Sequence, residues 1–131
     1  MSHIINKLKE AGVTPTTQRV DIANILFAQN QHLSAEQILR QVNLNKPLVS
    51  KATVYNTLGL FAEKGLINEV LVDASKVFYD SNVTKHFHFY NDDTSELIDI
   101  PLDKIRVDQL PELPEGTTAA NVEVIVHIKN S

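Results

Sequence analysis

The change in hydrophobic spacing along the chain is the sequence feature that most limits its fold. As far as Gly65, apolar residues recur three and four positions apart, which predicts short amphipathic helices. The β-rich runs "LINEVLV" and "KVFYD" follow on either side of a polar Asp-Ala-Ser turn, which predicts a hairpin. Helices followed by a hairpin are the order of a winged helix-turn-helix, so we predict such a domain over residues 1–80.

Residues typical of helix ends give the expected boundaries in this region. Ser34, with Gln37 three positions later, matches a capping box for the third helix. Pro47 prevents that helix from continuing through the loop. We expect the fourth helix to run from Ser50 to Lys64 and to stop at Gly65.

The C-terminal part has strand patterns but little material for a core. The runs "FHFY" and "ELIDI" flank a polar turn, and "NVEVIVHI" follows a proline-rich connection. So short a segment can hardly bury a core alone, and we expect residues 81–131 to pair with a second copy in a homodimer. The predicted fold class is α+β, with an N-terminal winged helix-turn-helix and a small C-terminal antiparallel β dimerisation domain.

Composition excludes several kinds of site. The chain has no cysteine, which excludes disulfides, thiolate catalysis and cysteine-ligated zinc, and which fits a cytoplasmic location. The net charge of −4 is uneven, with a balance of +1 over residues 1–80 and −5 over residues 81–131. DNA binding depends on local patches more than on total charge, so DNA stays possible as a partner. We expect no signal peptide and no membrane partner, since no apolar run reaches membrane-spanning length.

In a winged helix-turn-helix, the helix before the hairpin lies in the major groove and exposes its first turns to the base edges. The candidate DNA-binding residues are Arg19, Lys51, Thr53, Tyr55 and Asn56. We expect Tyr55 and Asn56 to lie near bases, and Arg19 and Lys51 to contact phosphates. The alternative is an ordinary solvated helix face, since any surface helix needs polar residues.

The pair His86 and His88 is the most distinctive feature of the C-terminal part. On a strand, alternate side chains share a face, so the two imidazoles would point the same way. Taken alone, the pair is better explained by two incidental histidines on a partly exposed strand.

Several stretches in fixed order carry a family resemblance: "GVTPTTQRVDIANIL", "HLSAEQIL", "SKATVYNTLGLFAEKGLINEV", "FYD", "HFH" and "ELIDI". On these stretches the chain resembles the ferric uptake regulator (Fur) family of metal-dependent bacterial repressors. Beyond Ile100, the proline-rich stretch looks most like the iron response regulator branch. The resemblance implies a dimeric repressor of metal homeostasis or related stress genes that binds a double-stranded DNA operator.

The resemblance also implies a regulatory metal site. The family uses a histidine at the start of the third helix, an acid at the end of the wing, two histidines on the next strand and an acid on the strand after it. The matching residues are His32, Asp80, His86, His88 and Asp99. Imidazoles and carboxylates suit Fe²⁺ or Mn²⁺ and also accept Zn²⁺. Haem on His86 and His88 is a further possibility, and singly His32 could cap a helix while either aspartate could be a surface carboxylate.

The chain also departs from the family pattern. The four-cysteine structural zinc of many members is impossible here. A further metal site of some relatives is expected to be missing, because Lys85, Phe87 and Asn121 stand at its ligand positions. Asn56 replaces an arginine usual in iron-uptake repressors, so operator preference could differ.

Two other classes of function remain open. Two histidines and a carboxylate with open positions can form the iron site of a non-haem metal enzyme, although the ligands would straddle a domain junction. A winged-helix module can also bind only proteins, but that role leaves five matching ligands unexplained.

Overall fold

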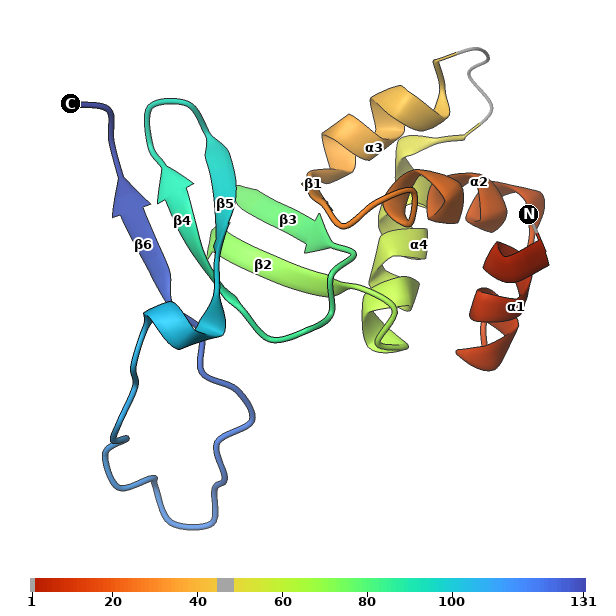
Figure 1. The fold of residues 1–131 in the computed structure, drawn as a ribbon. Helices are drawn as coiled ribbons and strands as arrows, with labels where there is room; N and C mark the ends of the chain where they lie inside the picture. The colour runs from red at the N-terminus through yellow and green to blue at the C-terminus, as the bar shows by residue number, and fades with distance from the viewer. Residues whose placement is uncertain (1, 45–48) are drawn as a thin grey trace. The chain divides into compact units, whose positions relative to one another are not determined.

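The structure, a computed structural model, describes residues 2–44 and 49–131, so Pro47 lies outside the described residues. The chain forms two compact units, residues 1–83 and 84–131 (Figure 1). The sequence-based boundary after Asp80 lies three residues earlier than this division. The first unit contains the helices α1 (Ser2–Glu10), α2 (Thr17–Leu26), α3 (Ala35–Val42) and α4 (Lys51–Glu63).

Side-chain caps begin three of these helices. The capping box predicted for α3 is confirmed: Gln37 N donates to Ser34 Oγ over 3.2 Å, and Ser34 N donates to Gln37 Oε1 over 2.9 Å. Ser50 caps α4 in the same way by accepting from the backbone N–H of Thr53. Gly65 follows the end of α4 with a φ of 76°, a left-handed conformation that favours glycine.

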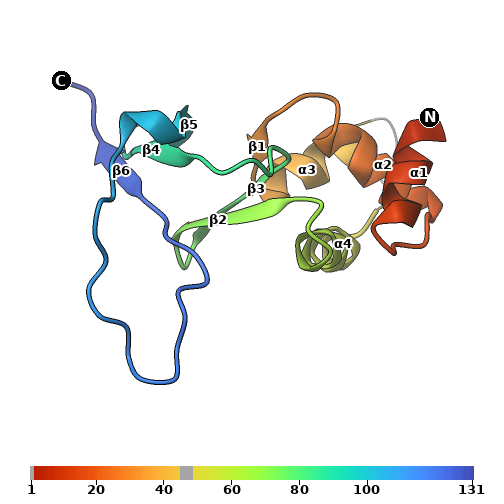
Figure 2. The same ribbon diagram turned by 60° about the horizontal axis from the view of Figure 1, so that its bottom comes forward.

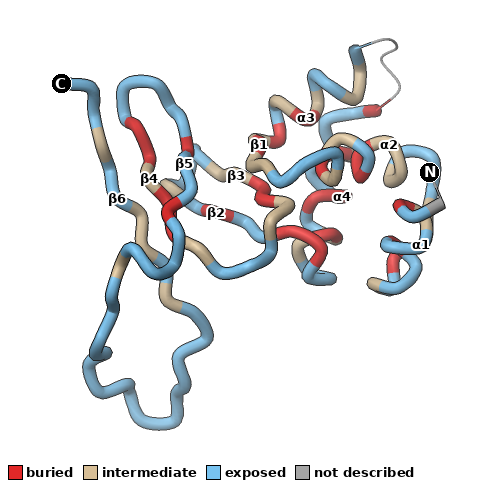
Figure 3. Tube along the Cα trace, viewed as in Figure 1, coloured by how far each residue is buried: buried red, intermediate tan, exposed pale blue. Residues whose placement is uncertain are grey.

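The core of the first unit lies between the helices and the hairpin (Figure 3). Side chains with no exposed surface come from all four helices: Leu8, Ile22, Ala23, Leu26, Ile38, Val54, Leu58 and Phe61. Each fully buried aliphatic or aromatic side chain contributes about 1.5–3 kcal/mol of transfer free energy. On α2, Ile22, Ala23 and Leu26 are fully buried, whereas Val20 and Phe27 are only half-buried. This helix contacts α1, α3 and α4, so it is buried on more than one side.

The hairpin predicted after α4 is confirmed and belongs to a three-stranded sheet. Strands β2 (Asn68–Asp73) and β3 (Lys76–Asp80) pair antiparallel. A two-residue strand, β1 (His32–Leu33), pairs antiparallel with the other edge of β3, which gives the order β1-β3-β2. The sequence analysis missed β1, because two residues are too few to show a strand pattern.

The second unit contains a three-stranded sheet with the order β5-β4-β6 (Figure 1). Strands β4 (Phe87–Asn91) and β5 (Glu96–Ile100) form the predicted antiparallel pair. The last strand, β6 (Ile125–Ile128), runs parallel to β4, so the prediction of a wholly antiparallel domain is wrong for this strand. Parallel pairing needs a long crossover, and residues 101–124 provide one.

This crossover is the most exposed part of the second unit. It begins with a short 3₁₀ helix, η1 (Leu102–Lys104), and then leaves the sheet as a wide loop in both ribbon views (Figure 2). Almost every residue of the loop is exposed. The sheet itself therefore carries the buried side chains of this unit, and β4 is its central strand.

We expect Ser34→Ala to lower the free energy of unfolding by about 1 kcal/mol, because the variant loses the N-cap acceptor of α3. Ser34→Asp keeps an acceptor at that position and should retain most of the stability. Urea unfolding followed by circular dichroism, at one fixed protein concentration, measures the difference. Equal stability of Ser34→Ala and the wild type would mean that the capping box contributes nothing.

Candidate metal centre and nucleic-acid interface

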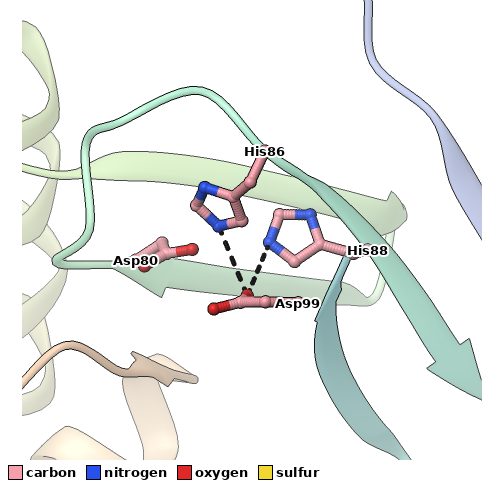
Figure 4. Close-up of side chains that lie close together, drawn as sticks. All are labelled: Asp80, His86, His88 and Asp99. Carbon is pink, nitrogen blue, oxygen red and sulfur yellow. Dashed lines mark ion pairs between the residues drawn. The ribbon is translucent and has the colours of Figure 1, made fainter. Parts of the chain in front are cut away.

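Two imidazoles of the second unit converge on one carboxylate (Figure 4). His88 and Asp99 are cross-strand partners in β4 and β5, and His86 directly precedes β4. His86 Nε2 lies 3.3 Å from Asp99 Oδ1, and His88 Nε2 lies 3.4 Å from the same oxygen. The ring centroids of the two histidines are 4.6 Å apart. The shared direction predicted from their spacing is therefore present in the fold.

Hydrogen bonding at His86 shows that this cluster fits a cation. His86 Nδ1 lies 2.6 Å from the carbonyl oxygen of Thr84, which can only accept, so Nδ1 carries the proton. In this tautomer the neutral ring carries a lone pair on Nε2, which can coordinate a metal ion. The approach of Nε2 to Asp99 Oδ1 brings a nitrogen and an oxygen ligand atom close enough to bind one cation together. A backbone carbonyl that orients a histidine ring is also the usual second partner of a metal-binding imidazole.

Burial shapes access to the cluster. The side chains of His86 and His88 are 10% and 8% exposed, whereas that of Asp99 is 48% exposed. The imidazoles are thus largely shielded from solvent, whereas about half of the Asp99 side chain is exposed. A small ion can approach from the carboxylate side without unfolding of the strands.

The other two predicted ligands belong to the first unit, where they face each other. His32 in β1 and Asp80 at the end of β3 are cross-strand partners. Asp80 is 1% exposed, and its Oδ1 accepts from the backbone N–H of Asn82 over 2.9 Å. The ring of His32 packs edge-on against Phe78, with centroids 6.4 Å apart.

His32 does not lie at the start of the third helix as predicted. It lies in β1, and Ser34 rather than His32 caps α3. The reason is the pairing of β1 with β3, which holds the residues before the cap in an extended conformation. The helix-cap alternative for His32 is therefore wrong.

Side chains other than metal ligands hold the positions of the further family site. Lys85 Nζ donates to Asn121 Oδ1 over 2.7 Å and to the carbonyl of Val122 over 2.9 Å. Phe87 is buried, with 5% of its surface exposed. At these positions the chain has a lysine, whose hydrogen bonds join the segment before β6 to the segment before β4, and a buried aromatic ring.

The candidate DNA-binding residues lie on α2 and α4. Lys51, Tyr55 and Asn56 are exposed on α4, while Thr53 is half-buried and accepts a hydrogen bond from the Ser50 hydroxyl. Arg19 donates from Nη1 to the carbonyl of Thr14 over 2.9 Å, which holds its side chain near the start of α2.

A hollow of about 300 Å³ connects part of this set. Its lining includes Arg19, Thr53 and Asn56 together with Thr16 and Gln18 from the start of α2. Thr16 and Gln18 were not among the predicted candidates. The N-cap pattern before α2 was the available signal, since it places polar side chains at the start of the helix.

The profile of the family described as "Ferric uptake regulator family" matches residues 10–127. The chain belongs to this family. Fur-family members are transcription regulators, so the chain is a metal-responsive, DNA-binding transcriptional regulator and not an enzyme. The metal-enzyme and protein-module alternatives are thereby set aside.

Known relatives agree with this membership. The chain is 28% identical over 118 residues to the peroxide-responsive repressor PerR of Staphylococcus epidermidis, covering 90% of this chain and 77% of the relative. It is 30% identical to PerR of Staphylococcus aureus (strain USA300), covering 85% and 70% of the two chains. These relatives are peroxide-responsive repressors by name, and none of them identifies the iron response regulator branch.

Solved structures of Fur proteins share the fold. The ferric uptake regulator of Pseudomonas aeruginosa with manganese superposes with a TM-score of 0.71 at 23% identity, covering 95% of this chain and 96% of that one. The regulator of Francisella tularensis with iron gives a TM-score of 0.74 at 20% identity, with 91% and 92% covered.

None of the helices in the described part of this Fur-family chain is long and apolar enough to cross a membrane.

We expect His86 of the metal-free protein to be the Nδ1–H tautomer at mildly alkaline pH, because the Thr84 carbonyl accepts from that nitrogen. Nitrogen-15 chemical shifts of the imidazole, measured by long-range proton–nitrogen correlation, distinguish the two tautomers. His127 provides a positive reference for the same tautomer, since its Nδ1 contacts the Asp92 carboxylate, which also accepts. An Nε2–H tautomer at His86 would contradict the orientation described above.

Proposed function

We propose that the protein is a repressor whose affinity for operator DNA depends on a divalent metal ion. The proposed ligands of this ion are His32, Asp80, His86, His88 and Asp99. The convergence of two imidazole nitrogens on the Asp99 oxygen is the observation that carries this proposal. Three of the proposed ligands lie together in the second unit, and the other two are cross-strand partners in the first. Each unit therefore offers a part of the ligand set.

The ligand atoms favour particular ions. An all nitrogen and oxygen set suits Fe²⁺ or Mn²⁺ and also accepts Zn²⁺. A sulfur ligand from cysteine is impossible, since the chain has none. Haem on His86 and His88 is less well supported, because both imidazoles are nearly buried and would have to leave the strand environment to reach a large planar ligand.

Metal ligands that come from both units would allow metal binding to control DNA binding. A divalent cation would be bound by the Asp80 and Asp99 carboxylates and by the imidazole nitrogens, which are favourable partners for a positive charge. His32 and Asp80 move with the DNA-binding unit, and His86, His88 and Asp99 move with the other. If all five ligands act together, they hold one relative orientation of the units, and the population shifts toward that orientation.

The first unit is proposed to be a winged helix-turn-helix that binds DNA through α4. The exposed Tyr55 and Asn56 would face base edges, with Lys51 and Arg19 on phosphates. Thr16 and Gln18, which line the polar hollow beside Arg19, would make additional contacts to the phosphate backbone of the DNA. The helix α4 and the hairpin β2–β3 have the order that this mode of docking requires.

The second unit is proposed to form a homodimer through one face of its sheet. Phe89 is in register with Ile98 on β5 and with Val126 on β6, so these apolar side chains form a row across all three strands. Ile98 and Val126 are 41% and 37% exposed. A continuous apolar row on a small sheet is better stabilised against a second copy than against water.

We also propose the target genes, the cellular location and the operator preference of this regulator. The relatives named as peroxide-responsive repressors support target genes of metal homeostasis or stress. A soluble regulator of DNA works in the cytoplasm, and Asn56 is proposed to give it an operator preference of its own. Placement in the iron response regulator branch, which rests on the proline-rich crossover, stays a prediction.

We expect His86→Ala and His88→Ala each to weaken Mn²⁺ or Fe²⁺ binding by at least about 100-fold, more than typical changes outside the ligand shell. His32→Ala should weaken metal binding less but remove its effect on DNA affinity, because His32 belongs to the other unit. Anaerobic metal titrations with and without the operator duplex measure both quantities. For wild type, operator DNA should change metal affinity by the same factor as metal changes DNA affinity.

His127→Ala is the matched control for these variants. It removes an imidazole from the same unit, but that imidazole pairs with Asp92 outside the cluster. Its metal affinity should equal that of the wild type. A wild type that binds neither ion, or whose metal affinity ignores the operator, would rule out an equilibrium metal switch.

We expect Val126→Glu to raise the dissociation constant of the homodimer about tenfold or more. The variant puts a charge into the apolar row that the second copy would bury. Val107→Glu introduces the same change in the exposed crossover and should leave the dimer intact. Sedimentation equilibrium over a range of concentrations gives both constants. A wild type that sediments as a folded monomer would disprove the dimer.

A further inference from the structure

Glu36, in the first turn of α3, lies against the exposed start of α4. Glu36 Oε1 is 3.4 Å from Lys51 Nζ and 3.4 Å from the hydroxyl of Tyr55. Lys51 Nζ also lies 5.9 Å from the centre of the Tyr55 ring. The side chains of Lys51 and Glu36 are 65% and 53% exposed, so a polyanion in solution can reach the pair. An acidic residue therefore touches two of the side chains that we assign to DNA binding.

Helix electrostatics hold Glu36 in place and favour its contact with Lys51. Glu36 is in the first turn of α3, where a negative charge interacts favourably with the helix dipole. Lys51 is the first residue of α4, where a positive charge interacts unfavourably with the dipole of its own helix. The carboxylate offsets this cost, so the ion pair is the favoured state of Lys51 in the absence of DNA. The contact to the Tyr55 hydroxyl is long for a hydrogen bond and adds less.

We infer that Glu36 sets the DNA affinity of α4 by competing with DNA phosphate for Lys51. This inference rests on the proposed binding of DNA through α4. A phosphate that pairs with Lys51 must displace the Glu36 carboxylate, which is then left close to the negatively charged backbone. Glu36 would take up a cation from solution at the same time as the phosphate releases one. The Lys51 contact then adds little to the salt dependence of binding while Glu36 is present.

The same residues could lower affinity in a simpler way, by general repulsion between Glu36 and DNA. The two explanations differ in their dependence on Lys51. Competition for Lys51 disappears when Lys51 is replaced, whereas general repulsion persists. A double-mutant cycle between Glu36→Gln and Lys51→Gln separates them.

The experiment uses the full chain as wild type, E36Q, K51Q, the double variant and E63Q. Two probes are titrated over a series of salt concentrations: a random-sequence duplex, and the duplex that wild type enriches from a random pool. E36Q should bind both about two- to fivefold more tightly, the range expected for one exposed ion pair. Its plot of log K against log salt should be steeper by about 0.9, the value for one further phosphate contact. K51Q and the double variant should bind equally.

E63Q removes the same charge at the far end of α4. Glu63 lies twelve positions after Lys51, about 18 Å along the helix at 1.5 Å per residue. Glu63 has no ion pair with any residue that the structure describes. E63Q should therefore bind both duplexes with wild-type affinity. Circular dichroism of each variant checks that the helices are retained.

Three results would overturn the inference while leaving the proposed function intact. They are wild-type affinity in E36Q, a gain from E36Q that persists in the K51Q background, and an equal gain in E63Q. If wild type binds neither duplex with or without Mn²⁺, the proposed function fails and this inference fails with it.

Discussion

Two imidazole nitrogens and one carboxylate oxygen face one another at β4 and β5 of the second unit, and this close approach is the constraint on which the proposed metal site depends. The Thr84 carbonyl orients His86, and the strand register places His88 opposite Asp99. Buried neighbours such as Tyr90 and Leu97 keep these strands in place. The packing thus holds the three side chains close together, so the proposed metal ion would meet ligand atoms that are already in position.

In the first unit, strand β3 holds the other two proposed ligands in position. It pairs with β2 on one edge and with β1 on the other, and it ends in the buried Asp80. The pairing with β1 is what places His32 opposite Asp80, directly before the cap of α3. A shift of this pair would therefore reach both the sheet and the helix α3, which begins after Ser34. This connection would link the proposed metal site to the helices that we propose to face DNA.

The chain carries a net charge of −4, so its proposed DNA-binding surface must be arranged locally. Lys51 and Arg19 supply positive charge on the first unit, and Glu36 partly neutralises Lys51. Phosphate contacts dominate non-specific binding, whereas base contacts supply specificity. In the proposed binding mode, weaker phosphate contacts would leave a larger share of the total affinity to the base contacts of Tyr55 and Asn56. Such a balance suits a regulator that must release its DNA when a signal changes.

Local signals in the sequence determined the helices, the hairpin and the H-x-H pair. A capping box, a left-handed glycine and an alternating strand depend on residues within a few positions of one another, so they can be read without the fold. The tertiary structure alone decided the two-residue β1, the parallel β6 and the contact of Glu36 with Lys51. The approach of Asp99 to both imidazoles was expected only from the family resemblance, because it depends on the register of β4 and β5. The pattern of "NVEVIVHI" predicts a strand but carries no information on its direction or partner. Those depend on which strand edge has free backbone groups and on how far the crossover reaches, and both arise only when distant segments pack together.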